Sequence, residues 1–389
     1  MHGITRRRFI QGSFLGASLS LFAPFSFTRA STHADNSRKN SVKRIMRRLG
    51  KTGIELPVVS MGVMNADNPS LVRAAIEAGI VYFDTAHGYQ RGNNETMLGQ
   101  VLKGYPRESF VIGTKIHPEG KDGMLSKLDL SLQRLQMPYV DILFVHGARS
   151  KEDVVSSDTL DALKSAKAAG KVRHLGVSTH RNVPEVTRAA MESGVYEVVL
   201  ASVNFKEGEY PEIARALAEA TGAGLGIIAM KTMAGAFHDK ERTKPINCKA
   251  ALKWVLQNEN IATAIPGITT FDQLTENVSV NEDLSMTEQE KSDIAVGKAE
   301  GSLYCQGCDR CVPQCPRRLP IPDLMRSYMY TYGYRNPSMA RDLLASLAVD
   351  RDPCRGCASC AVRCVQGLNV PERIADIARL TSVPHEFLL

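Results

Sequence analysis

The N-terminal region of this 389-residue chain lacks an apolar run long enough for a confident membrane span, which needs about 20 residues. It also lacks cysteine, which excludes lipoprotein processing there. Residues 1–30 hold four arginines and no acidic side chain. The rest of the chain therefore has 44 basic and 41 acidic side chains, so its net charge is small. The composition therefore gives no reason to expect nucleic acid as a partner.

The first thirty residues have the organisation of an export signal. Arg6 and Arg7 precede a moderately apolar stretch, Phe14–Phe27, and Thr28–Ala30 offers small residues for cleavage. The arginine pair followed by Phe-Ile resembles the twin-arginine signal, which predicts the twin-arginine translocase as a partner and a periplasmic or other extracytoplasmic location. An uncleaved anchor and a disordered basic tail remain alternatives. Residues 31–42 are polar and read as a linker.

A Gly-rich dinucleotide fingerprint is also missing, since Met61–Met64 follows the first expected strand. This disfavours an open doubly wound sheet. Short apolar or β-branched runs recur instead, with helical patterns between them. The expected strands span 58–62, 81–84, 110–114, 141–146, 172–178, 198–204, 226–230 and 262–266, and the helices 70–78, 94–103, 124–135, 158–168, 184–192, 211–220, 248–258 and 271–280. This α/β alternation predicts a (β/α)8 TIM barrel over residues 43–298.

A barrel of this kind places its chemistry at the carboxyl ends of the strands. Asp84, Lys115 and His146 end three consecutive expected strands, and Tyr89 lies just beyond the second. A phenol is a weak acid, so we expect Lys115 to lower the pKa of Tyr89 and Asp84 to hold Lys115. His146 can hydrogen-bond a carbonyl while Tyr89 gives it a proton. These four residues are the predicted catalytic set.

Each of these residues also has a structural interpretation. Asp84 could cap the next helix. Tyr89 could be a surface aromatic, and Lys115 and His146 could be solvated strand ends. Any one alone is more often structural than catalytic, but four compatible groups at consecutive strand ends favour a catalytic site.

Several segments resemble signatures of the aldo-keto reductase family. They are Phe83-Asp84-Thr85-Ala86-His87-Gly88-Tyr89, Asn94-Glu95, Leu98-Gly99, Gly113-Thr114-Lys115, Leu143-Phe144-Val145-His146 and Gly170–Ser178. The resemblance covers roughly residues 43–285. It implies that the four residues above form the family's catalytic tetrad. It also implies NAD(P)(H) bound across the barrel mouth without a Gly-rich loop, and a small carbonyl or alcohol substrate.

The resemblance further implies cofactor-binding residues. Ser178 and Asn204 match positions near the nicotinamide, and Glu276-Asn277 matches a motif for the adenine end. Lys231 is a candidate phosphate contact, with a strand-end lysine as the alternative. The chain departs from the family at Leu200 and Val203, where a glutamine and a stacking tyrosine are usual, and at Gly267, Ile268 and Gln273, where NADP-preferring members have basic or hydroxyl groups.

Eight of the nine cysteines lie between residues 305 and 364. Both runs have the ferredoxin spacing Cys-x2-Cys-x2-Cys-x3-Cys, although Val365 replaces the proline usual after the second. In two-cluster ferredoxins the fourth cysteine of each run ligates the other cluster. We therefore expect two [4Fe–4S] clusters, one on Cys305, Cys308, Cys311 and Cys364 and one on Cys354, Cys357, Cys360 and Cys315.

Disulfides and structural zinc compete with this interpretation. Disulfides suit an exported protein, but cysteines three apart pair poorly and twin-arginine substrates fold in a reducing cytoplasm. Zinc prefers Cys-x2-Cys pairs separated by longer loops. Two helical patterns, 322–334 and 337–347, lie between the runs, so residues 299–389 resemble a small, mainly α-helical ferredoxin-like domain.

The sequence thus predicts an exported oxidoreductase with a reductase barrel and an iron–sulfur domain. One alternative is an electron-transfer protein whose barrel only docks a redox partner protein. Another is a structural role for the clusters. A hydride carries two electrons and a cubane accepts one, and no flavin motif is visible to convert between them.

Overall fold

The computed structural model describes residues 43–357 and 359–388, so the expected signal peptide and linker lie outside the described residues. Eight parallel strands form one sheet in chain order from β3 to β10. They are β3 (Met61–Gly62), β4 (Tyr82–Asp84), β5 (Val111–Ile116), β6 (Val140–Val145), β7 (Val172–Thr179), β8 (Val198–Ser202), β9 (Gly226–Met230) and β10 (Ile261–Ala264). The amides of Ser60 and Gly62 donate to the carbonyls of Ala264 and Pro266, at 2.8 and 3.0 Å, so the two sheet edges meet.

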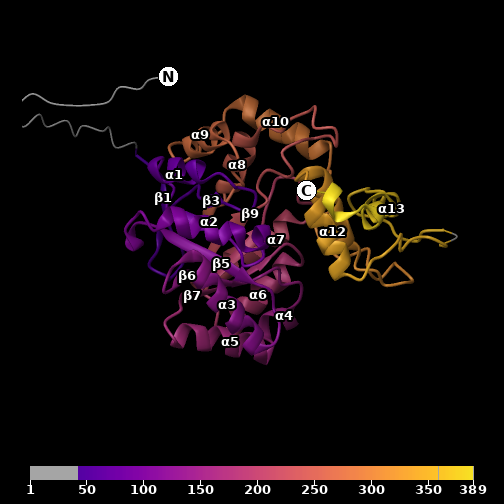
Figure 1. Ribbon diagram of the computed structural model, residues 1–389. Helices are drawn as coiled ribbons and strands as arrows, with labels where there is room; N and C mark the ends of the chain where they lie inside the picture. Colours follow the sequence, from indigo (N-terminus) through magenta and orange to yellow (C-terminus); the bar gives the residue numbers. More distant parts are fainter. Residues whose placement is uncertain (1–42, 358, 389) are drawn as a thin grey trace, which may run out of the picture. The chain divides into compact units, whose positions relative to one another are not determined.

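Helices follow the strands around this sheet (Figure 1). They are α1 (Pro69–Glu77), α2 (Asn93–Leu102), α3 (Lys121–Leu135), α4 (Lys151–Val155), α5 (Ser157–Ala168), α6 (Val183–Ser193), α7 (Tyr210–Gly222), α8 (Cys248–Leu256), α9 (Phe271–Ser279) and α10 (Glu288–Ala299). The alternation confirms the expected α/β barrel. An antiparallel hairpin, β1 (Met46–Arg48) with β2 (Glu55–Pro57), precedes it.

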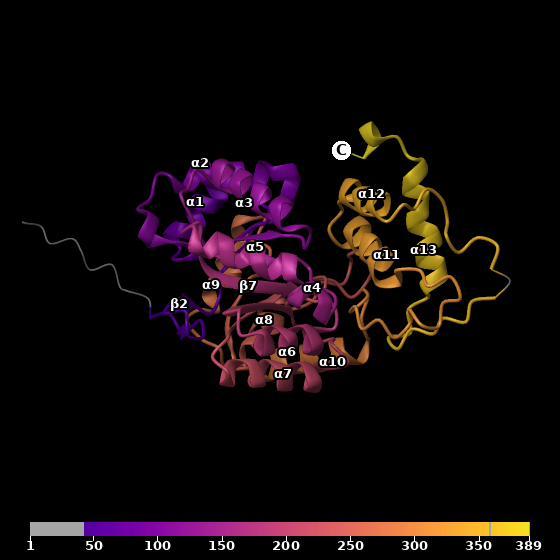
Figure 2. The same ribbon diagram turned by 90° about the horizontal axis from the view of Figure 1, so that it is seen from below.

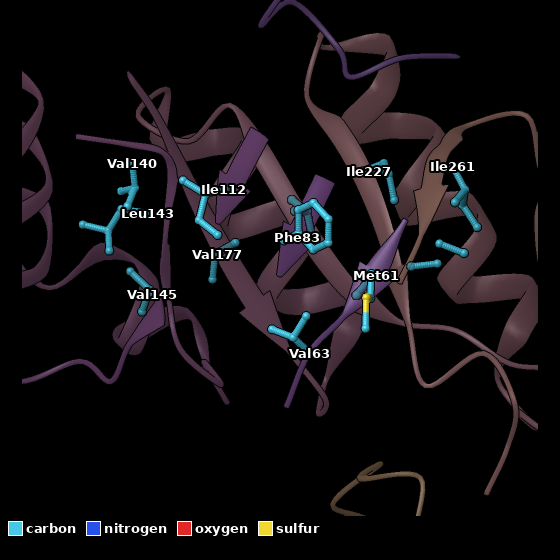
Figure 3. Packing of buried hydrophobic residues seen from close by; sticks show 14 of the residues in the cluster. Met61, Val63, Phe83, Ile112, Val140, Leu143, Val145, Val177, Ile227 and Ile261 are labelled. Carbon is cyan, nitrogen blue, oxygen red and sulfur yellow. The ribbon is translucent and has the colours of Figure 1, made fainter. Parts of the chain in front are cut away.

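Side-chain alternation divides strands such as β6 between two apolar clusters. On β6, Ile142 and Phe144 belong to a cluster inside the barrel, whereas Leu143 and Val145 belong to the larger cluster outside it. Figure 3 shows members of the outer cluster, including Phe83. Because both faces are buried, β6 reads as an unbroken apolar run after Asp141, as parallel strands do.

Local signals fix the helix starts. Asn68 caps α1, accepting a 2.9 Å hydrogen bond from the amide of Ser70, and proline follows at the first helical position. Thr287 and Glu290 form a capping box at the start of α10. The capping box marks the start of α10, the last barrel helix, which directly precedes the cysteine-rich segment.

The cysteine-rich segment has its own helices and its own core. Its helices are α11 (Ile321–Tyr328), the π-helix η3 (Met329–Gly333), α12 (Pro337–Ser346) and α13 (Val370–Ala378). Both α12 and α13 pack on α11 (Figure 2). Leu324, Ile374 and Ile377 are buried there with Cys311 and Cys315. The two helices expected between the cysteine runs are present, whereas α13 was not expected. No helix of the described part of the chain is long and apolar enough to cross a membrane.

Candidate active site

The catalytic set predicted from strand ends comes together at the barrel mouth. Asp84 ends β4, Lys115 is the penultimate residue of β5, and His146 directly follows β6. Lys115 Nζ forms an ion pair with Asp84 and donates a 2.6 Å hydrogen bond to the carbonyl of Thr85. Lys115 and Asp84 are only 2% and 3% exposed, so water hardly screens this pair.

Tyr89 completes the set from the short helix η1 (Tyr89–Gly92). Lys115 Nζ lies 5.0 Å from the centroid of the Tyr89 ring, and the Tyr89 and His146 rings meet edge to face at 5.8 Å. Gln90 and Arg91 have positive φ, a strained arrangement for residues other than glycine. The Gln90 amide donates to the carbonyls of Met64 and Ala66, at 3.0 and 3.2 Å, which holds the turn in place.

Burial controls the protonation of this set. It raises the pKa of Asp84 and lowers the pKa of Lys115, each against the attraction of the other. It also raises the pKa of Tyr89 well above its usual range, and the charge of Asp84 adds to the shift. The expectation that Lys115 lowers the pKa of Tyr89 is therefore wrong, because the lysine charge is matched by Asp84 and burial dominates. Tyr89 holds its proton throughout the neutral range.

His146 is neutral at pH 7. Burial lowers its pKa well below the usual value, with further contributions from His117 and Lys115. His117 stacks on His146 with ring centroids 4.3 Å apart, and its Nδ1 lies 2.9 Å from the His146 carbonyl oxygen. Sequence reasoning missed His117, although it follows Lys115 by two residues and therefore shares its strand face. A neutral imidazole keeps one N–H to donate.

The cysteine-rich segment also reaches this site, which the sequence did not reveal. Tyr330 and Tyr334 raise the pKa of Tyr89, and Arg326 acts in the opposite direction. The rings of Tyr330 and Tyr334 stack at 5.7 Å, and the Tyr334 hydroxyl accepts a hydrogen bond from Lys231. Tyr330 and Tyr334 thus lie at the site, whereas Tyr328 and Tyr332, which alternate with them in sequence, pack into the core of the segment.

Three of the predicted cofactor-binding residues follow consecutive strands. Ser178 lies near the end of β7, Asn204 follows β8, and Lys231 follows β9. Ser178 Oγ accepts a 2.9 Å hydrogen bond from the amide of Gly147. The Asn204 amide donates to Glu207 at 3.0 Å and to Gln306 of the cysteine-rich segment at 3.3 Å.

These polar groups suit the binding of a carboxamide and a phosphate. A bound dinucleotide would have to replace the hydrogen bonds that they make with neighbouring residues in this structure. The other two predicted residues, Glu276 and Asn277, lie on α9, the first exposed and the second buried. Leu200 and Val203 are fully buried and apolar, so neither can bind a carboxamide.

The four cysteines of the first predicted set, one of which comes from the second run, lie around one cavity. Cys305, Cys308, Cys311 and Cys364 are all on its wall. Burial raises the pKa of Cys305 to about 12, and the other three thiols of its set contribute. Burial likewise raises the pKa of Cys354 to about 11, with contributions from Cys360, Cys357 and Cys315.

All nine cysteines are free thiols. Within residues 43–357 and 359–388, no three Cys, His, Asp or Glu side chains converge as ligands of a single metal ion. A cubane makes a different demand, because each of its four thiolates binds a different iron.

Buried charges join the cysteine-rich segment to the barrel. Arg181, which follows β7, donates to Asp323 of α11 at 2.8 Å and to Asp309 at 2.6 Å. Arg149 adds a 3.3 Å ion pair to Asp323. The Arg181 and Asp323 side chains are 11% and 3% exposed, so this pairing fixes α11 against the barrel.

A parallel barrel with acid–base groups at its strand ends serves many reactions, so the class of this protein follows from its relatives. Residues 62–250 match the Aldo/keto reductase family, and the chain is an oxidoreductase of the aldo-keto reductase type. It is 27% identical over 297 residues to L-galactose dehydrogenase of Arabidopsis thaliana, covering 64% of this chain and 92% of that protein. It is 25% identical over 327 residues to L-glyceraldehyde 3-phosphate reductase of Escherichia coli O157:H7, covering 66% and 93%.

A solved structure shares the fold. The holo form of an aldo-keto reductase from Bacillus halodurans superposes with a TM-score of 0.57 at 21% identity, over 68% of this chain and 99% of that chain. This likeness concerns the barrel architecture and supports the closed eight-stranded arrangement described above.

Proposed function

We propose that this protein interconverts a small carbonyl compound and its alcohol with NAD(P)(H), using Tyr89, Lys115, Asp84 and His146. The observation that carries the proposal is the convergence of Tyr89 and His146 beside the buried Lys115–Asp84 pair. Three of these groups come from consecutive strand ends and Tyr89 from η1, and the phenol and imidazole rings meet edge to face.

The chain's own residues handle that oxygen. Neutral His146 donates a hydrogen bond to the carbonyl oxygen and orients it. Tyr89 gives its proton to the same oxygen as negative charge develops there, and the Lys115 ammonium stabilises the phenolate that remains. A bound nicotinamide dinucleotide supplies the hydride for the carbonyl carbon. Ser178, Asn204, Glu276 and Asn277 are the residues that would hold it.

The relatives help to choose substrates. Their names specify a galactose dehydrogenase and a glyceraldehyde 3-phosphate reductase. Short aldehydes and ketones carrying hydroxyl or phosphate groups are therefore the first compounds to assay.

The test uses the full chain purified with its iron. NADH or NADPH oxidation is followed with small aldehydes and ketones, and Tyr89→Phe is compared with Tyr105→Phe, a half-buried tyrosine outside the site. We expect Tyr89→Phe to lower kcat by about 10²–10⁴-fold, the usual contribution of general acid catalysis. Normal turnover by Tyr89→Phe would contradict the assignment.

The same proposal includes two [4Fe–4S] clusters on the two cysteine sets. The shared cavity of Cys305, Cys308, Cys311 and Cys364 supports the first. The contribution of Cys360, Cys357 and Cys315 to the raised pKa of Cys354 supports the second. The clusters would transfer electrons or hold the segment together, and the leader would direct the folded protein out of the cytoplasm by the twin-arginine route.

One observation favours the second function, an electron-transfer protein with a non-catalytic barrel. Gln306 and Tyr334 bind Asn204 and Lys231, and Leu200 and Val203 offer no polar group to a nicotinamide. Iron-loaded protein that binds neither NADH nor NADPH, yet accepts electrons from a redox partner protein, would favour this function.

A further inference from the structure

The barrel mouth carries more positive charge than its catalytic set requires. Besides burial, the strongest influences on the pKa of His180 are Arg326, Lys231, His146 and Lys115, and all of them lower it. Lys115 is matched by Asp84. Among residues 43–357 and 359–388, neither Arg326 nor Lys231 forms an ion pair with a carboxylate, although both influence the pKa of His146.

Arg326 lies on α11 and is half-buried. Asp323, one helical turn earlier, is the natural partner for it. That carboxylate is already bound by Arg181 and Arg149 of the barrel. Across residues 43–357 and 359–388, the Arg326 side chain makes no hydrogen bond and no ion pair, so a partly desolvated guanidinium remains at the mouth with its donors unused.

Lys231 is held at the same place by the backbone. It has a positive φ of 62°, which is unfavourable for a lysine and is typical of functional positions. Its ammonium lies 4.6 Å from the centroid of the Tyr334 ring and donates to the Tyr334 hydroxyl, a neutral partner. The conformation therefore keeps a cation at the end of β9 without neutralising it.

We propose that Arg326 and Lys231 bind an anionic group of the carbonyl substrate, a carboxylate or a phosphate, next to Tyr89 and His146. This assigns Lys231 to the substrate in place of the cofactor phosphate for which the sequence made it a candidate. Guanidinium and ammonium together suit such a group, because arginine binds two of its oxygens in a fork and lysine adds a point charge. The inference rests on the proposed carbonyl chemistry. The inference assigns substrate selection to a residue of the cysteine-rich segment. Such a site would favour short substrates in which the anionic group and the carbonyl are close together.

The experiment compares matched substrates in the full, iron-loaded chain. Pyruvate and methyl pyruvate test the carboxylate, and glyceraldehyde 3-phosphate and glyceraldehyde test the phosphate. We expect wild-type kcat/KM to favour the anionic member of at least one pair by about tenfold or more, and Arg326→Gln to reduce that ratio by about 10–100-fold, as expected for a charged hydrogen-bond partner. Arg326→Lys should restore part of the ratio. Arg379→Gln, at an exposed arginine of the same segment, should leave it unchanged.

Calorimetry with two unreactive anions, oxamate and inorganic phosphate, separates the two proposals. If either anion binds to wild type but not to Arg326→Gln, and no carbonyl compound is turned over, the proposed function is refuted and the anion site is supported. Equal turnover of the charged and uncharged substrates by wild type would overturn the inference. So would an equal loss for both members in Arg326→Gln, the result expected if this guanidinium binds dinucleotide phosphates instead. Binding of neither anion would overturn it too.

Discussion

Removing the Arg181 side chain should loosen the cysteine-rich segment from the barrel. Arg181 binds two carboxylates, and the nearly buried Asp323 would lose its 2.8 Å partner in Arg181→Gln. Breaking a buried ion pair typically costs about 3–5 kcal/mol because it leaves an unmatched charge. Arg149 remains 3.3 Å from Asp323 but is half-exposed, so we expect the lower end of that range, about 3 kcal/mol.

Hydrogen exchange measured by mass spectrometry gives the local readout that this prediction needs. A loss of about 3 kcal/mol corresponds to a roughly 100-fold faster exchange of the protected amides of α11, if they exchange by local opening. Amides of β6 and β7 should keep their protection, because the barrel core does not depend on this pair. Global melting is less suitable, because two-state unfolding is expected mainly of single domains under about 150 residues.

Arg188→Gln is the matched control. Arg188 also binds two carboxylates, Glu212 and Glu219, but on the outer surface of the barrel, where ion pairs contribute about 0–1 kcal/mol. It should leave α11 unchanged. Unaltered protection of α11 in Arg181→Gln would refute the reasoning, since it would mean that apolar packing alone holds the segment in place.

Three further predictions concern the metal, the mouth and the leader. The chain should hold about eight iron atoms. Because the fourth cysteine of each run is expected to ligate the other cluster, Cys315→Ser should abolish the same paramagnetic signal as Cys354→Ser, and Cys364→Ser should abolish the other signal. Loss of the same signal in Cys315→Ser and Cys364→Ser would contradict this. Burial lowers the pKa of Lys231 to about 8, so this side chain is charged below that pH and neutral above it. The preference of the enzyme for anionic carbonyl substrates should therefore fall as the pH rises through about 8. Lys231→Arg should remove this pH dependence, and a flat wild-type profile would exclude Lys231 as its source. Replacing Arg6–Arg8 by lysines should leave the precursor in the cytoplasm on cell fractionation, and undiminished export would exclude a twin-arginine signal.

The barrel was predictable because its signals are local. A strand buried on both faces reads as a short apolar run, and β9 has the bounds expected for it, residues 226–230. Asp84, Lys115 and His146 follow from strand order alone, since parallel strands bring their carboxyl ends to one rim. Short helices such as α4 were missed because five residues carry too little periodicity.

The acidity of Tyr89 and the role of α11 were not predictable in the same way. Sequence spacing places Lys115 near Tyr89 but does not show how deeply either is buried, and burial decides the direction of the pKa shift. Likewise, Arg326 lies more than two hundred residues from Tyr89 in sequence. The ion pairs of Arg181 and Arg149 with Asp323 bring α11 to the barrel, and no local pattern encodes a contact between such distant segments.

The position of α11 also bears on why a reductase barrel would carry iron–sulfur clusters. A hydride transfers two electrons and a cubane accepts one, so direct exchange between them is difficult without a flavin. The cysteine-rich segment can serve the barrel in another way, because Arg326 and Tyr334 influence the pKa of Tyr89 from outside the barrel. Metal binding orders segments that bury little apolar surface by themselves. Clusters that fix the fold around α11 would then shape the substrate site whether or not electrons pass through them.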